Sequence, residues 1–120
     1  METKRLTYGE TRLMQLIWEH APLLSSRLAE LCRRELGWKK STTYTMLKKL
    51  TEKGYAQNEN ALVTALISRE TAQMEESRYV VATSFSGSLP SFLVSFLGGK
   101  TISDAEAEEL KALIDAHREG

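Results

Sequence analysis

The apolar residues of this chain follow a helical repeat up to Gly54 and lose it directly afterwards, and this change of period limits the folds open to the chain. Before Gly54, three short amphipathic segments are separated by the breakers Ala21-Pro22 and Gly37. After Gly54, β-prone segments at residues 55–57 and 62–67 flank a turn-forming stretch at residues 58–60. We therefore predict a mainly α fold, a winged helix-turn-helix made of three helices and a β-hairpin wing.

Local signals place the starts of the three helices. Thr7 and Glu10 have the spacing of a capping box at the start of the first helix. Ser25 or Ser26 is expected to cap the second helix. The third helix is expected to begin near Lys40 or Ser41.

Beyond the hairpin, the chain returns to helical patterns that carry more apolar surface than a short segment can bury alone. The last pattern opens on a capping signal at Ser103. We expect a second copy of the chain to cover this surface in a two-fold homodimer, and the alternative is that these helices fold back on the winged helix of a monomer. The expected dimerisation residues are Leu89, Phe92, Leu93, Phe96, Leu97, Leu110, Leu113 and Ile114.

Charge is distributed unevenly along the chain. The whole chain has no net charge, but residues 1–67 carry +4 and residues 68–120 carry −4, and residues 33–53 alone carry +5. A basic stretch beside an acidic tail is typical of a protein that meets phosphates with one part only, although basic runs are also common on solvated helix faces. We predict a DNA-binding domain over residues 1–68 and a helical dimerisation region over residues 69–120.

The third helix offers the best candidate for DNA contact. If Thr43, Met46, Leu47 and Leu50 face the core, a turn of about 100° per residue puts hydroxyl side chains and then lysines on the opposite face. Early hydroxyl residues of a recognition helix reach base edges and later basic residues pair with phosphates. At the wing tip, Glu59 would repel phosphate, so wing contact is expected to be minor. The predicted DNA-binding residues are Lys39, Lys40, Ser41, Thr42, Tyr44, Thr45, Lys48, Lys49, Asn58 and Asn60.

Few residues are suited to catalysis or metal binding. His20 and His117 are far apart in the sequence, and the acidic residues within 106–109 fit a solvated helix face. Cys32, the single cysteine, excludes an intrachain disulfide and makes a thiolate metal cluster unexpected. No glycine-rich phosphate loop is present. We predict no enzyme activity, no cofactor and no metal site.

The sequence also bears on the compartment. No apolar run approaches the length of a membrane span. The N-terminal stretch METKRLTYGE lacks the apolar segment of a secretory signal. We expect a cytoplasmic protein with no membrane insertion.

Three stretches of the chain carry a family resemblance. LTYGETRLMQLIWEHAPLLSSRLAE, LGWKKSTTYTMLKKLTEKGY and NENALVTALISRE resemble the BlaI/MecI/CopY (penicillinase repressor) family, and the second stretch is the most specific. The tail, GSLPSFLVSFL followed by SDAEAEELKALID, is similar to the dimerisation region of that family. The resemblance implies a homodimeric transcriptional repressor of resistance or stress genes on a double-stranded, dyad-symmetric operator, often with a membrane sensor-protease as partner.

The resemblance also suggests roles for individual residues. The recognition-helix positions of the family fall on Ser41, Thr42, Tyr44, Thr45 and Lys48, and both tryptophans of this chain match family tryptophans. Where family members are cleaved on induction, the corresponding bond is Ser95-Phe96, although cleaved members usually have Asn in place of Ser95. The copper-responsive branch carries paired C-terminal cysteines, which this sequence lacks, so copper sensing by that route is excluded.

Two alternatives to a simple repressor remain open from the sequence. A winged helix can serve protein–protein assembly, which does not need a basic recognition face. A repressor can also sense a small molecule, here in a pocket between Trp18, Phe85, Phe92 and Phe96.

Overall fold

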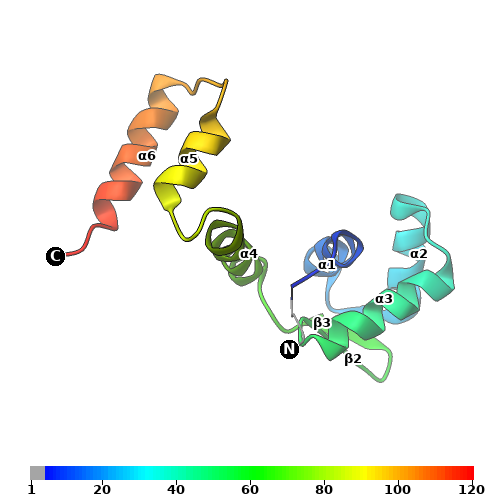
Figure 1. Cartoon of the computed structure of the whole chain (residues 1–120). Coiled ribbons are helices and arrows are strands. Elements are labelled where there is room, and N and C mark those ends of the chain that lie inside the picture. Colours follow the sequence, from blue (N-terminus) through cyan, green and yellow to red (C-terminus); the bar gives the residue numbers. More distant parts are fainter. Residues whose placement is uncertain (1–4) are drawn as a thin grey trace. The chain divides into compact units, whose positions relative to one another are not determined.

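The computed structural model describes residues 5–120, so the first four residues of the METKRLTYGE stretch lie outside it. The chain forms two compact units, and the division falls within one helix, after Tyr79. The division into a DNA-binding domain over residues 1–68 and a dimerisation region over residues 69–120 stays a prediction. Along the chain the elements are α1 (Tyr8–His20), β1 (Leu23–Leu24), α2 (Ser25–Leu36), α3 (Lys40–Glu52), β2 (Ala56–Glu59), β3 (Leu62–Ala65), α4 (Arg69–Ser84), α5 (Leu89–Leu97) and α6 (Asp104–Ala116), as Figure 1 shows.

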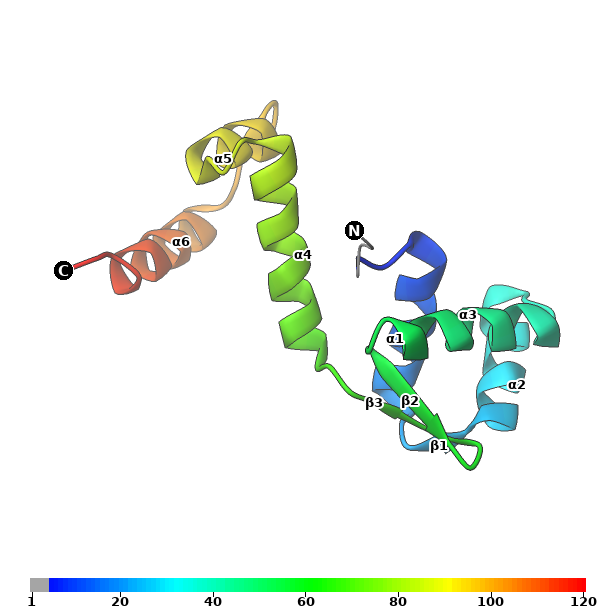
Figure 2. The same cartoon turned by 60° about the horizontal axis from the view of Figure 1, so that its bottom comes forward.

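The first unit confirms the predicted fold class, a winged helix-turn-helix followed by further helices. Helices α1, α2 and α3 precede the antiparallel hairpin of β2 and β3, which begins directly beyond the end of α3 (Figure 2). The capping box at the start of α1 is present as expected: the Thr7 hydroxyl accepts from the Glu10 amide, and the Glu10 carboxylate accepts from the Thr7 amide. Gly37 ends α2 in the left-handed conformation, with φ of 69°.

The start of α2 differs from the prediction. Neither Ser25 nor Ser26 caps this helix, because its N-cap residue is Leu24, which makes no side-chain capping hydrogen bond. Leu23 and Leu24 form the short strand β1, which sequence reasoning missed, and they pair with Val63 and Leu62 of β3. This pairing holds the backbone extended up to Leu24, so the helix begins one residue earlier than a serine cap allows.

The wing is therefore the outer part of a three-stranded antiparallel sheet in the order β1-β3-β2. Its turn lies at Asn60 and Ala61, which both have positive φ (51° and 66°), whereas the sequence pattern predicts the turn at residues 58–60. Asn58 and Glu59 belong to β2 and pair with Val63 and Leu62. A two-residue turn with positive φ at both positions matches the twist of a hairpin.

The core of the first unit lies where the three helices meet the sheet. Its apolar side chains come from one buried stripe on each of α1, α2 and α3, and the sheet adds Val63 and Ala56. The fully buried side chains Leu13, Ile17, Leu28, Leu47 and Leu50 join the three helices into one cluster. Burial of these stripes fixes the rotation of α3, and so decides which of its side chains reach solvent.

The second unit, residues 80–120, has a different character. It contains the end of α4 and the two helices α5 and α6, which are capped by the hydroxyls of Ser88 and Ser103, the second of them as predicted. None of its residues is buried. A helical unit with apolar stripes but no buried residue has no core of its own.

The individual helices fall short of a membrane span. Within residues 5–120, no single helix is long and apolar enough to cross a bilayer, and α4 with α5 reaches that length and composition only across a sharp bend.

Candidate nucleic-acid interface

Helix α3 has a buried face and an exposed face that carry different chemistry. Thr43, Leu47 and Leu50 are buried against the core. The opposite face exposes hydroxyls in the first two turns and amines in the third, and Lys40 lies with its Nζ 5.9 Å from the ring centre of Tyr44. The predicted DNA-binding residues on this exposed face are Lys39, Lys40, Ser41, Thr42, Thr45, Lys48 and Lys49, with Tyr44 half-buried at its edge.

The N-termini of α2 and α3 differ from those of the other helices. Hydroxyls of Thr7, Ser68, Ser88 and Ser103 accept from backbone amides at the starts of α1, α4, α5 and α6. In the described part of the chain, α2 and α3 alone begin without such a side-chain cap. Free amides and the positive end of the helix dipole favour an anion at both positions.

A groove of about 420 Å³ joins these two helices. It is lined by Arg27 and Arg33 of α2 and by Lys40 of α3, together with Ser26, Ala29 and Glu30. The Arg27 guanidinium lies 3.0 Å from the Glu30 carboxylate, so this pair supplies less positive charge than Arg33 and Lys40 do. The sequence-based list of DNA-binding residues lacks Ser26 and Arg27, although the apolar stripe of α2 places both on its outward face.

The wing residues divide into two groups. Asn58 shares a second groove, of about 430 Å³ between α3 and β2, with Tyr44 and Lys48. Asn60 is exposed in the turn and does not line this groove. The Glu59 carboxylate is exposed and accepts from the Gln57 amide, with Nε2 and Oε2 2.6 Å apart. The structure thus brings Asn58, but not Asn60, beside the exposed face of α3.

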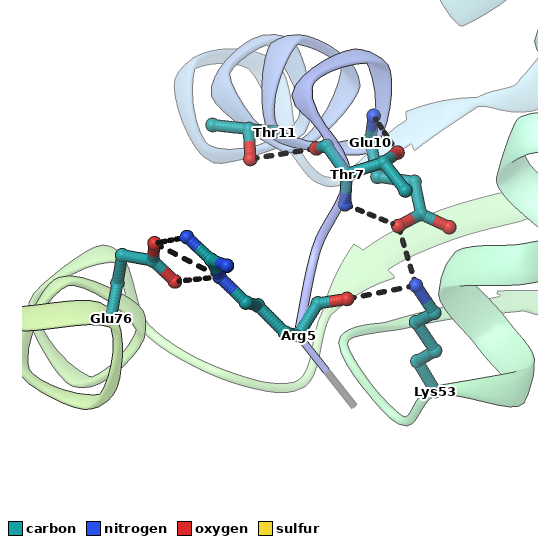
Figure 3. Close-up of polar contacts among 6 residues, drawn as sticks. All are labelled: Arg5, Thr7, Glu10, Thr11, Lys53 and Glu76. Carbon is teal, nitrogen blue, oxygen red and sulfur yellow. Dashed lines mark hydrogen bonds and ion pairs between the residues drawn. The ribbon is translucent and has the colours of Figure 1, made fainter. Parts of the chain in front are cut away.

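The end of α3 is anchored to α1 by a buried ion pair. Lys53 Nζ lies 2.6 Å from Oε1 of Glu10, whose side chain is 1% exposed, and 3.0 Å from the carbonyl oxygen of Arg5 (Figure 3). Burial by itself raises the pKa of Glu10, but the hydrogen bonds from Lys53 and from the Thr7 amide outweigh it and leave the pKa below its usual value. The capping carboxylate of α1 therefore also holds the C-terminal end of α3.

Residues considered for catalysis are separate in the structure. His20 is exposed beside Glu19, and His117 Nδ1 lies 2.8 Å from the carbonyl oxygen of Leu113. Cys32 is buried in the core, and burial raises the pKa of its thiol, which disfavours the reactive thiolate. Within residues 5–120, no group of three or more His, Cys, Asp or Glu is arranged to hold a metal ion.

The four residues predicted to line a small-molecule pocket are divided between the two units. Trp18 lines a cavity in the first unit, and none of the three phenylalanines is among its lining residues. Phe85, Phe92 and Phe96 lie in the second unit, where the Phe92 ring is 5.5 Å from Phe85 and 5.8 Å from Phe96. Helical spacing brings these three rings together. Within the first unit, the indole nitrogen of Trp18 donates a hydrogen bond to the carbonyl of Ile67.

The predicted dimerisation residues are exposed to different degrees on α5 and α6. Phe96, Leu89, Ile114 and Leu113 expose more than half of their surface. The others are Leu110, which is 37% exposed, and Phe92, Leu93 and Leu97, which are half-buried. Ser95 and Phe96, which flank the predicted cleavage site, lie in the last turn of α5.

Comparison with known proteins relates this chain to a family model, a curated relative and a solved structure. The family model described as "Penicillinase repressor" matches residues 6–116. The penicillinase repressor of Bacillus licheniformis is 25% identical over 121 residues, which cover 95% of this chain and 92% of the relative. The solution structure of the DNA-binding domain of the repressor BlaI matches with a TM-score of 0.49 and 22% identity, and covers 59% of this chain and 93% of that one.

Proposed function

The chain belongs to the penicillinase repressor family, and on that premise we propose that it represses transcription as a homodimer bound to a dyad-symmetric operator. Helix α3 of each protomer enters a major groove. Its hydroxyl residues read base edges, and its lysines pair with phosphates. The location is cytoplasmic, and the regulated genes serve antibiotic resistance or stress responses.

The observation that carries this proposal is the layout of α3. A helix whose buried side is apolar and whose exposed side presents Ser41 and Thr45 before Lys48 has base-reading groups at its N-terminal end and phosphate-pairing groups behind them. Two uncapped helix N-termini and the basic groove beside Arg33 lie next to this face and suit the sugar–phosphate backbone on either side.

The case for a homodimer comes from the second unit. Its helices expose Phe96, Leu113 and Ile114 without burying any residue of the unit. Such an apolar surface needs a partner, and a second copy of the same surface gives a two-fold interface. Two-fold symmetry in the protein calls for an inverted repeat in the operator.

The induction route follows from the family premise. A membrane sensor-protease would act on the Ser95-Phe96 bond, which lies in a regular helix. A protease binds its substrate in extended form, so cleavage would require the end of α5 to open first. Opening the helix would also remove Phe96 from the proposed dimer surface.

Selection of bound sequences from a random pool of duplex DNA, with the full-length chain as the binder, tests the proposal without assuming any operator sequence. The expected product is a sequence with two inverted half-sites, and a gel shift should show loss of binding when one half-site is scrambled. No enrichment, or enrichment of a single unrepeated motif, would contradict a dimeric repressor, and no enrichment would favour the assembly role for the winged helix.

A further inference from the structure

The first unit contains a cavity of about 830 Å³ that the proposed repressor function does not use. It is lined by α1, by the segment before it and by residues 69–79 of α4, and it lies apart from the residues assigned to DNA. Its apolar wall includes Leu6, Trp18 and Ala72. This volume falls within the range typical of small-molecule sites.

The charged groups of the cavity favour a cation. Three carboxylates, those of Glu19, Glu75 and Glu76, line it together with two guanidinium groups, those of Arg5 and Arg69. Both guanidinium groups are already engaged, since Arg69 lies over the ring of Trp18 at 5.6 Å and Arg5 pairs with Glu76. The ring of Tyr55 also lines the cavity, and burial together with the charges of Glu75 and Glu76 raises the pKa of its phenol.

Arg5 itself shows how a cation is held there. Its Nη2 lies 2.6 Å and its Nε 3.1 Å from Glu76 Oε1 (Figure 3), and its guanidinium carbon lies 4.4 Å from the centre of the Tyr79 ring. A carboxylate and an aromatic face are the two groups that bind organic cations. The Arg5 side chain is 43% exposed and lies outside any helix or strand, so it can move into solvent without disrupting a regular element and leave the Glu76 carboxylate and the Tyr79 ring to another cation.

We propose that this cavity binds an amphipathic organic cation, with a quaternary ammonium or amidinium head and an aromatic body. The head takes the place of the Arg5 guanidinium between Glu76 and Tyr79, and the body lies along Leu6 and Trp18. The inference goes beyond the repressor function, and its test uses no DNA.

Titration of the full-length chain with benzyltrimethylammonium, followed by the two indole N–H signals in nitrogen–proton correlation spectra, tests this site. The Trp18 signal should shift and saturate. Trp38 serves as an internal control because its ring lies near Gly9 and does not line the cavity, so its signal should stay in place. The neutral N,N-dimethylbenzamide and the anionic 3-phenylpropionate, which have similar aromatic bodies, should leave Trp18 unshifted.

Variants distinguish this site from general attraction of cations to an acidic surface, because removing one basic side chain should strengthen cation binding. Arg5→Ala removes the internal cation and should tighten benzyltrimethylammonium binding about three- to tenfold. Adding Glu76→Gln to Arg5→Ala should weaken binding about tenfold relative to the single variant. Lys111→Ala, which breaks the exposed pair with Glu108 in the second unit, should leave the dissociation constant unchanged.

Three results would overturn the proposal. One is a Trp18 signal that the cation leaves unmoved in both the parent chain and Arg5→Ala. Another is an equal shift with the neutral or the anionic probe. The third is weaker binding in Arg5→Ala, which would mean that Arg5 is part of the site rather than its internal occupant.

Discussion

Lys53 and Glu10, 43 residues apart in the sequence, form an ion pair of 2.6 Å in which the carboxylate is buried. The pair joins the end of α3 to the first turn of α1. Removing the ammonium group leaves a buried charge without its partner, and such changes are strongly destabilising. Lys53→Met should therefore lower the free energy of unfolding by about 3 kcal/mol in a urea titration.

The matched control for that variant is Arg27→Ala, which breaks an ion pair whose two side chains are at least half exposed. It should change the free energy of unfolding by less than about 0.5 kcal/mol. Equal effects of the two substitutions would mean that the Lys53–Glu10 pair has no special role in anchoring α3.

The lowered pKa of Glu10 predicts a pH dependence of stability. A carboxyl group whose pKa is depressed in the folded state contributes its stability above the unfolded pKa, near 4.5, and loses it as the pH falls through the folded pKa. Unfolding titrations of the parent chain should show a loss of stability below about pH 4.5 that is shallower in Glu10→Gln. Identical slopes would show that Glu10 does not titrate differently in the folded chain.

Base reading by α3 predicts a loss of discrimination when its hydroxyls are removed. Ser41→Ala or Thr45→Ala should each reduce the preference for the selected operator over random duplex by about 1–3 kcal/mol. Competition gel shifts measure this preference. As a control, Thr101→Ala removes the hydroxyl of an exposed residue of the second unit and should leave this preference unchanged. If Ser41→Ala and Thr45→Ala also keep the preference, α3 does not read the bases through these hydroxyls.

Phosphate pairing by α3 predicts a different pattern for its lysines. Lys48→Ala or Lys49→Ala should weaken binding to operator and random duplex alike and reduce the salt slope by about one. Binding isotherms over a range of salt concentrations give the slope. Lys100→Ala, outside the proposed interface, should keep the parent slope, and a slope that stays the same in all variants speaks against phosphate contacts by α3.

The apolar surface of the second unit predicts the assembly state. Phe96→Asp puts a charge on a side chain that is 61% exposed in the chain alone and that we propose to be buried between protomers, so the dimer should dissociate. Sedimentation equilibrium measures the mass. Ser91→Asp, on an exposed position of the same helix, should remain dimeric; a dimeric Phe96→Asp variant would place the interface elsewhere.

Local features of the fold were predictable because their causes are local. The capping box of α1 needs only Thr7 and Glu10 three residues apart, and the left-handed end of α2 needs only Gly37. Strand β1 could not be read in the same way, since Leu23 and Leu24 are extended only because they pair with β3, some 40 residues later. The same pairing, with the hydrogen bond from the Ser25 amide to the carbonyl of Ala61, explains why Ser25 does not cap α2.

The candidate site also combines features with local causes and features that depend on contacts between distant residues. The helical repeat of the apolar residues was enough to predict the exposed and buried faces of α3, because a helix buries its apolar stripe. The basic groove beside Arg33, the Lys53–Glu10 pair and the contact of Arg5 with Glu76 join residues from different elements. No periodicity in the sequence reports such contacts, and only the folded chain brings them together.

At the starts of α2 and α3, no side chain of the N-cap residue accepts a hydrogen bond from the first-turn backbone amides. These amides can donate to an acceptor outside the protein. A serine placed at position 24 or 39 would satisfy those amides within the chain and raise the melting temperature of the free protein. It would also act as a rival acceptor to any phosphate oxygen that approaches the same amides. If α2 and α3 meet phosphates as proposed, substitutions that stabilise the free protein at these two N-cap positions would therefore weaken its binding to DNA.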